Sequence, residues 1–283
     1  MAPTERLRPA RLDKGHIPQA MVLSREAGWN QIAADWEMFV AQGKVFGMFD
    51  GDALVGTAAV MPYDTHAAWI GMVLVRISHR RRGIGKRMLD ICLEEIRAQN
   101  RTAYLDATPA GQALYETLGF EGEFPITRWE ADLGGGAARG VRAGAPGALP
   151  PDAIARIVAL DDAAMGMRRE ALMTSLSARV PGIARLTPDG DAFVLARDGD
   201  RALQIGPLVS QTEAEAARLL DSALAQVEGP VFIDAVDGNP RIEETLAQRG
   251  FAIQRPFLRM RSGPRLRAGD AGRLFAISGP EFG

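Results

Sequence analysis

The sequence predicts an α/β chain made of two tandem copies of one α/β unit. Strand-like apolar runs alternate with amphipathic helical runs in both halves of the chain. The halves share a pattern of apolar strand, Asp-Ala, proline-containing turn, helix and Gly-Phe, at residues 102–120 and again at 230–251. Between them, residues 133–150 are rich in glycine, alanine and proline and lack apolar periodicity, as flexible linkers do. We therefore expect one domain at 1–132 and a second at 151–283.

The composition is that of a globular protein and narrows the function classes. A length of 283 residues suits two domains, and an apolar fraction of 47% with 24% charged residues excludes a disordered chain. A formal net charge of −2 provides no global attraction for nucleic acid. The single cysteine, Cys92, excludes an intrachain disulfide, and the three histidines are too far apart for metal-ligand spacing. We expect no metal and no nucleic-acid partner.

The sequence shows no targeting or membrane signal. Residues 1–16 are charged throughout and lack the apolar core of a secretory signal. The most apolar stretch, 67–75, is too short to cross a bilayer, and one free thiol suits a reducing compartment. We expect a cytoplasmic protein without membrane association.

Apolar spacing and turn residues predict the elements of the first half in order. Helix 83–99 has the strongest pattern, and Cys92 lies on its apolar face, so we interpret that thiol as buried packing. Asp50-Gly51 is a hairpin signal, and Asn30 is suited to cap a helix. The predicted elements are strand 7–11, helices 17–27 and 30–41, strands 44–49, 54–61 and 69–75, helix 83–99, strand 102–107, helix 109–118 and strand 124–131.

The second half repeats the later part of this order. Strand 202–209 and helix 213–227 correspond to strand 69–75 and helix 83–99, and Asp234 corresponds to Asp106. Residues 274–277 are predicted to add a final strand. For the charged residues Asp161, Asp162, Arg168 and Arg169 we favour solvated helix charge over a role in lining a cleft.

The main candidate site is a basic, glycine-rich turn at the start of helix 83–99. Arg80, Gly83 and Gly85 form the pattern Arg-x-x-Gly-x-Gly after an apolar strand. Glycines let main-chain amides approach an anion closely, and a helix start presents unpaired N–H groups. Arg81, Arg82, Lys86 and Arg87 add positive charge. This turn is therefore predicted to bind a pyrophosphate, and a solvated basic turn is the alternative.

Two familiar phosphate motifs do not fit this turn. A P-loop needs Gly-Lys-Ser/Thr, whereas Gly85-Lys86 is followed by Arg87. A dinucleotide fingerprint follows the first strand of a parallel unit, whereas this turn follows a fourth strand.

The order of strand, Arg-x-x-Gly-x-Gly, amphipathic helix, strand and LYETLGF resembles the GNAT superfamily of N-acetyltransferases, over most of residues 5–131. The second half, with QIGPLV and the final GPEFG, resembles the degenerate GNAT-like half of a bacterial two-domain subgroup. The resemblance implies an α/β (α+β) fold of two tandem GNAT-like units, each a mixed, mostly antiparallel sheet flanked by helices.

The resemblance also implies a cosubstrate, acetyl-CoA, and residues that bind it. The pantetheine arm would pair with the end of strand 69–75 as an added strand, and the amides of 81–86 would hold the pyrophosphate. Tyr115 matches the tyrosine that protonates the departing CoA thiolate, and core packing is the alternative for it. The implied binding residues are Val73, Leu74, Val75, Arg80, Arg81, Arg82, Gly83, Ile84, Gly85 and Lys86.

The general base and the acceptor site are less defined. Where several family members carry Glu or His on the fourth strand, this sequence has Trp69, which cannot take a proton. The alternatives are a water chain, an amine that arrives neutral, or a nearby acid or histidine. Trp29, Asn30 and Asp106 are candidate substrate-binding residues, with packing and helix capping as alternatives for the first two. The base candidates are Asp106, His66, Asp64 and Glu26.

The second half lacks the cofactor motif. Glu213 and Glu215 stand where the first copy has cations, and Leu246 stands where it has Tyr115. We expect this half to cover the acceptor groove or to supply one of its walls.

The first hypothesis is therefore an acetyl-CoA-dependent N-acetyltransferase that acts on a primary amine of a small molecule or protein by direct attack in a ternary complex. The second is a non-catalytic acyl-CoA sensor or interaction protein, and the third is an unrelated nucleotide binder. The sequence leaves the acceptor, the acyl chain and homodimer formation open.

Overall fold

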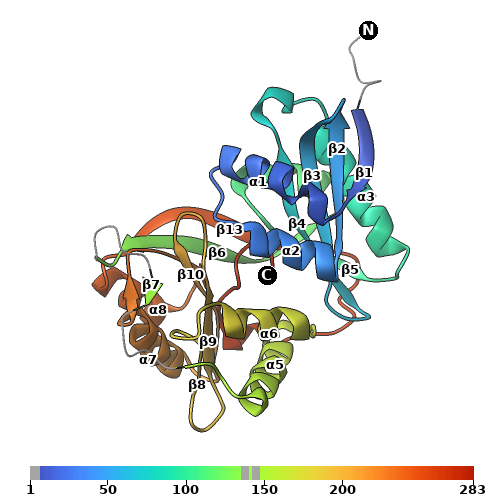
Figure 1. The fold of residues 1–283 in the computed structure, drawn as a ribbon. Helices are drawn as coiled ribbons and strands as arrows, with labels where there is room; N and C mark the ends of the chain where they lie inside the picture. The colour runs from blue at the N-terminus through green and yellow to red at the C-terminus, as the bar shows by residue number, and fades with distance from the viewer. Residues whose placement is uncertain (1–6, 135–139, 142–146) are drawn as a thin grey trace.

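The computed structural model describes residues 7–134, 140–141 and 147–283 (Figure 1). One twelve-stranded sheet, mostly antiparallel, runs through both halves and is flanked by helices, so the predicted fold class is confirmed. Residues 135–139 and 142–146 of the predicted linker lie outside the described residues, and the division at 133–150 stays a prediction.

The elements of the first half follow the predicted order closely. Helix α2 differs at its start, because its N-cap is Ile32 and not Asn30. The elements are β1 (Leu7–Leu12), α1 (Ile17–Glu26), α2 (Ala33–Gln42), β2 (Lys44–Asp50), β3 (Ala53–Pro62), β4 (Ala67–Val75), α3 (Ile84–Arg97), β5 (Thr102–Ala107), α4 (Pro109–Thr117) and β6 (Glu121–Asp132).

The second half repeats this order from its fourth strand onward. A short pair, β7 (Gly140–Val141) with β11 (Val227–Glu228), forms a separate two-stranded sheet. The other elements are α5 (Pro151–Met165), α6 (Glu170–Arg179), β8 (Arg185–Leu186), β9 (Phe193–Arg197), β10 (Leu203–Val209), α7 (Glu213–Leu224), β12 (Pro230–Val236), α8 (Pro240–Gln248), β13 (Ala252–Ser262) and β14 (Leu274–Ala276).

The two halves exchange their long closing strands. The strand order is β1-β2-β3-β4-β5-β13-β6-β12-β14-β10-β9-β8, so β13 of the second half lies against β5 of the first. In return, β6 of the first half lies against β12 of the second. Figure 1 shows β6 and β13 side by side where they cross between the halves. The sheet is continuous because each half completes the other.

A matched pair of buried ion pairs joins the exchanged strands to their new neighbours. Arg128 on β6 donates two hydrogen bonds to Asp234 on β12, at 2.7 and 2.8 Å. Arg259 on β13 donates two to Asp106 on β5, at 2.6 and 3.0 Å. Asp106 and Asp234 are the residues that correspond in the repeat, so the duplication extends to the arginines that bind them.

We expect Asp234→Asn to lower the free energy of unfolding by about 3–5 kcal/mol, because it leaves the buried Arg128 guanidinium without its counter-ion. Urea denaturation gives this value. The matched control is Asp221→Asn in the exposed pair with Arg249, where a loss of at most about 1 kcal/mol is expected. Equal losses in the two variants would contradict a structural role for the exchanged pair.

The central hydrophobic core is shared between the halves. Trp36, Phe39 and Trp69 of the first half belong to one buried cluster with Met173 and Phe282 of the second. The ring of Phe282 stacks on Phe39 at 4.9 Å between centroids. Residues 278–283 therefore lie inside the molecule, against β4 and α2, where the C label stands in Figure 1.

Two smaller expectations have opposite outcomes. Cys92 is fully buried on the core face of α3, as predicted. The expectation of solvated helix charge is wrong for Asp161 and Arg169, which are fully buried and form an ion pair at 2.6 Å. Arg169 also donates to the carbonyl oxygen of Phe282, so this pair anchors the final segment and is not surface charge.

Candidate active site

The turn before α3 presents a row of unpaired main-chain amides. Gly83 is the N-cap of α3 with a left-handed φ of +76°, and Arg81 has a φ of +63°. In the part of the chain that the structure describes, no amide of residues 81–86 donates a hydrogen bond. The positive end of the α3 dipole lies at the same place. This turn can therefore receive an anion of diphosphate size.

Contacts from α1 and β4 hold the start of this turn. The Glu26 carboxylate accepts hydrogen bonds from the Ile77 amide at 2.5 Å and from Arg76 Nε at 3.1 Å. These bonds, the Ile77 amide first, lower the pKa of Glu26 and keep it ionised. Arg80 Nε donates to the Val75 carbonyl oxygen at 3.2 Å. Glu26, a predicted base candidate, thus fixes the turn and is a weak proton acceptor.

Strand β4 has an open edge next to this turn. Its parallel ladder with β5 runs only from Ala67–Thr102 to Trp69–Tyr104, while β13 pairs with the other edge of β5. The Arg76 amide bonds to Val55 on β3. Because successive residues of a strand point their backbone groups to opposite edges, the groups of Val73 and Val75 face the opening and those of Leu74 face β3.

A β-bulge lies within the open stretch. Met72 has a left-handed φ of +55°, and the β3–β4 register shifts between Thr57 and Ala59. Thr57 Oγ1 donates to the Met72 carbonyl oxygen at 2.8 Å and fixes the bulge. Such a bulge turns backbone groups out of the ladder, so β4 offers free polar groups where it lines a pocket.

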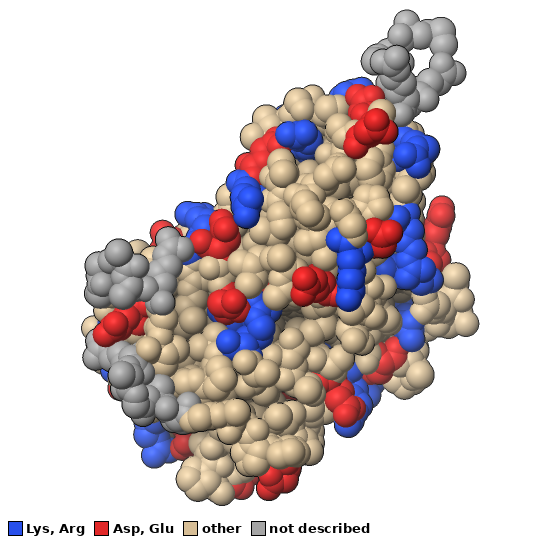
Figure 2. Space-filling view, viewed as in Figure 1, with Lys and Arg blue, Asp and Glu red and all other residues tan. Residues whose placement is uncertain are grey.

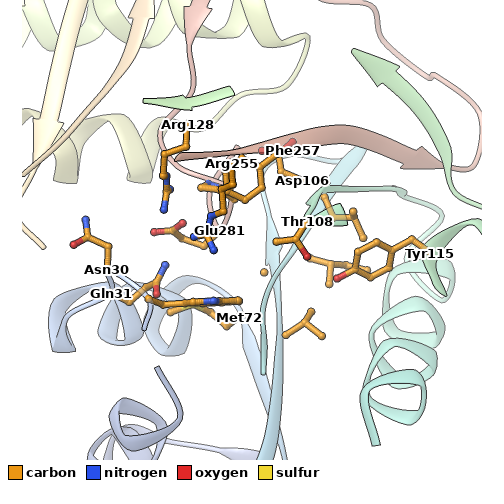
Figure 3. Close-up of a pocket in the computed structure, with 16 residues that line it drawn as sticks. Asn30, Gln31, Met72, Asp106, Thr108, Tyr115, Arg128, Arg255, Phe257 and Glu281 are labelled. Atoms are coloured by element: carbon orange, nitrogen blue, oxygen red, sulfur yellow. The ribbon is translucent and has the colours of Figure 1, made fainter. Parts of the chain in front are cut away.

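A pocket that opens to solvent lies between the two halves (Figure 3). Its walls come from the α1–α2 loop, β4, β5 and α4 of the first half and from β6, β13 and the final segment. Tyr115 lies at one end, and Asn30 and Gln31 lie at the other. The lining residues are Trp29, Asn30, Gln31, Ile70, Gly71, Met72, Val73, Leu105, Asp106, Thr108, Tyr115, Arg128, Arg255, Phe257, Pro280 and Glu281.

Tyr115 is held in this pocket by a glycine on α4 and a phenylalanine just after the helix. Its ring packs edge-to-face on Phe120 at 5.9 Å between centroids. Gly111 makes room for it, since a Cβ there would lie 2.8 Å from the ring. Burial raises the pKa of Tyr115 to about 12, so its hydroxyl carries a proton at neutral pH. The side chain is a half-buried proton donor that faces the pocket.

Similarity to known proteins agrees with this geometry. Residues 35–122 and residues 157–276 each match a family model described as "Acetyltransferase (GNAT) domain". The chain belongs to the GNAT acetyltransferase family. Members of this family generally use acetyl-CoA, so the protein is an acyltransferase of the GNAT type.

Three similar proteins match over most of this chain and most of their own length. The uncharacterized N-acetyltransferase YitH of Bacillus subtilis (strain 168) is 24% identical over 245 residues, which cover 85% of this chain and 86% of YitH. The crystal structure of a putative acetyltransferase from Pyrococcus horikoshii is 21% identical, with a TM-score of 0.80, and covers 100% of this chain and 98% of its own. A GCN5-related N-acetyltransferase from Sphaerobacter thermophilus is 15% identical, with a TM-score of 0.61, and covers 95% of this chain and 98% of its own.

The residues of this GNAT acetyltransferase fit acetyl-CoA. The free amides of 81–86 begin α3, which follows β4 in the chain, and Val73 at the open edge of β4 lines the same pocket as Tyr115. Arg81 and Arg82 have no acidic partner among the described residues, whereas Lys86 pairs with Asp90 at 2.9 Å. On the face shown in Figure 2, basic and acidic side chains are interspersed, and no basic stripe of the kind that nucleic acid needs is visible.

The three predicted acceptor residues all line the pocket, with different roles. Trp29 is half-buried, packs against the core and lines the pocket, whereas the Asn30 side chain is bonded to the second half. Its Oδ1 accepts from the amides of Arg201 and Ala202, and its Nδ2 donates to the Ala202 carbonyl. Asn30 therefore does not cap α2, because its side chain ties the α1–α2 loop to the second half.

The predicted base candidates are not suited to remove a proton here. Asp64 accepts from the amides of His66 and Ala67, and neither Asp64 nor His66 lines the pocket. Asp106 lines it, but both carboxylate oxygens accept from Arg259. Burial nevertheless raises the pKa of Asp106. Trp69 is fully buried and donates its indole N–H to the Pro280 carbonyl at 3.1 Å.

Sequence reasoning missed Gln31 and the pocket residues that the second half supplies, which are Arg255, Phe257, Pro280 and Glu281. Because β13 and the final segment reach the pocket only through strand exchange, local patterns do not reveal them. One signal was available: FPITR at 124–128 and RPFLR at 255–259 correspond in the repeat, and they differ where Arg255 replaces Phe124. No helix among the described residues is long and apolar enough to cross a membrane.

Proposed function

We propose that the protein transfers the acetyl group of acetyl-CoA to a primary amine of a small molecule or protein, by direct attack in a ternary complex. The observation that carries this proposal is a single pocket that contains both the open, bulged edge of β4 and the Tyr115 hydroxyl. A thioester bound along that edge supplies an activated acetyl group, and the amine enters from the side of the second half.

Each residue group has one task in this proposal. The amides of 81–86 hold the pyrophosphate, and the backbone of Val73 and Val75 pairs with the pantetheine arm. Backbone amides at the Met72 bulge, turned out of the ladder, orient and polarise the acetyl carbonyl. Tyr115 gives its proton to the thiolate as it departs.

The amine has to be neutral when it attacks. Among the described lining residues, the acids are Asp106 and Glu281, and each is already paired with a buried arginine. Each carboxylate accepts hydrogen bonding from its arginine, which occupies both oxygens of Asp106, so neither acid is well placed to take a proton from an amine. We therefore favour an amine that arrives neutral, or one that loses its proton to water.

The experiment is to measure release of free CoA thiol from acetyl-CoA across a panel of primary amines. We expect release that depends on the amine and saturates with it. The N-acetylated product, identified by mass spectrometry, would show that the amine is the acceptor. Saturable CoA binding without thiol release from any amine would instead favour the non-catalytic sensor.

A further inference from the structure

Arg255 differs from the other charged residues that line the pocket. In the part of the chain that the structure describes, it makes no hydrogen bond or ion pair, and its buried Nε has no partner. The other three have buried partners of opposite charge: Asp106 with Arg259, Arg128 with Asp234, and Glu281 with Arg197. The Nε–H of this guanidinium is shielded from water without a partner, and a buried donor of this kind is unfavourable unless a ligand supplies an acceptor.

The fold places Arg255 there through an irregularity in β13. The β6–β13 register shifts between Ile253 and Arg255, which sets Arg255 directly opposite Arg128. The Phe257 ring lies 5.1 Å from one guanidinium and 5.3 Å from the other. Like charges that face each other across a ladder destabilise a sheet, and burial with the charge of Arg128 lowers the pKa of Arg255. Stability therefore does not explain this arginine, whereas a bulge commonly re-aims a side chain toward a site.

A second unpartnered group lies at the same end of the pocket. The Oε1 atom of Gln31 is buried and accepts no hydrogen bond, although Gln31 also lines the pocket. Figure 3 shows Gln31, Arg255 and Glu281 grouped at the end opposite Tyr115. This end therefore offers a donor fork for an anion and, near it, an acceptor for an N–H or O–H group.

The end that holds these groups is closed on several sides. Asn30 is bonded to the 201–202 turn, and Pro280 is bonded to Trp69 of β4. The Glu281 carbonyl would lie 2.6 Å from a Cβ at Gly71, so this segment packs directly on the strand. The walls come from both halves and favour a small molecule over a folded protein.

We propose that the acceptor is a small amine that also carries an anionic group, a carboxylate or a phosphate, and that Arg255 binds this group. Gln31 Oε1 accepts a hydrogen bond from the same molecule, and its amino group lies toward Tyr115. The inference rests on the proposed acetyl transfer. A planar guanidinium fork suits both anions, because each offers two oxygens side by side.

The test compares matched acceptors that differ only in the anion. One arm pairs amino acids with their carboxamides, and the other pairs amino sugar phosphates with the free amino sugars. We expect kcat/KM for the anionic member to exceed that of the neutral member about 10- to 100-fold in at least one arm, and the arm identifies the anion. Arg255→Gln is expected to abolish this preference without changing the Kd of acetyl-CoA.

Controls separate binding from structure. Arg218→Gln on α7 removes one exposed positive charge far from the pocket and is expected to keep the preference. The Tm of Arg255→Gln is expected to stay the same or rise, because the variant removes an unpaired charge. Arg255→Lys keeps the charge without the fork and is expected to recover part of the preference.

The outcomes distinguish the two proposals. Equal rates for both members in both arms, or a preference that survives Arg255→Gln, would overturn the inference and leave acetyl transfer intact. A large fall in Tm for Arg255→Gln would also overturn it. If no amine causes release of thiol, the proposed function fails. The anion site can then be tested by itself, by calorimetric titration of the same anionic and neutral compounds into the CoA complex. Binding that requires both the anion and Arg255 would support the site.

Discussion

Replacing Tyr115 by phenylalanine is expected to lower kcat about 100- to 10,000-fold while the Kd of acetyl-CoA changes less than about twofold. The hydroxyl is the proton donor in the proposed reaction, and Tyr115 lines the pocket beside the open edge of β4. The ring that packs on Phe120 remains in the variant, so the fold and the binding groove are kept. Steady-state thiol release and calorimetric titration of CoA provide the two measurements.

Tyr104→Phe is the matched control. Tyr104 also loses only a hydroxyl, and its ring stacks on Trp69, but it does not line this pocket. We expect its kcat to stay within about twofold of the wild type. An unchanged kcat in Tyr115→Phe, or an equal loss in both variants, would show that the Tyr115 hydroxyl is not the acid.

The pH profile gives an independent readout of the same role. A phenol acts as an acid in its protonated form, and the pKa of Tyr115 is raised to about 12. Ionisation of Tyr115 therefore removes activity only as the pH approaches that value from below. Between about pH 8 and 10, kcat is expected to hold or rise, because a larger fraction of the amine is neutral. A fall centred near the ordinary tyrosine pKa would contradict the assignment.

Replacing Gly83 by glutamate is expected to weaken CoA binding at least about 100-fold. The new carboxylate would stand at the N-cap of α3 among the free amides of 81–86, where it would repel and displace the diphosphate. A Cβ at Gly83 meets no atom within 4 Å, so the variant is expected to fold. The left-handed φ of +76° adds a strain of about 1–2 kcal/mol that the native fold can carry.

Gly250→Glu provides the comparison for this variant. Gly250 has a φ of +79° and open space around it, but it follows α8 in the second half, away from the basic turn. The Gly250→Glu variant adds the same backbone strain and the same negative charge as Gly83→Glu, but we expect its affinity for CoA to be normal. Calorimetric titration of both variants decides the matter. Normal affinity in Gly83→Glu would mean that the diphosphate binds elsewhere.

The sequence was enough to predict the helices and strands, the basic turn before α3 and Tyr115 as a candidate site residue. These features depend on neighbours in the chain: apolar spacing specifies strands and helices, and a glycine N-cap exposes amides whatever the distant contacts are. Helix α3, its N-cap Gly83 and strand β5 therefore lie where the pattern predicted them. Asn30 shows the limit of such reasoning. Asparagine is a residue type that favours helix caps, but here its side chain accepts hydrogen bonds from the amides of residues 201 and 202.

Only the tertiary structure decided which half each closing strand joins. Because the halves are copies, β6 and β13 have equivalent patterns of apolar residues, and either strand could pair with the edge of β5. The choice depends on burial and ion pairing between residues more than 100 positions apart, such as Asp106 with Arg259. That choice also brought Arg255 into the pocket. Local periodicity carries no information about partners at such distances, since the free energy that selects them arises only when the halves pack together.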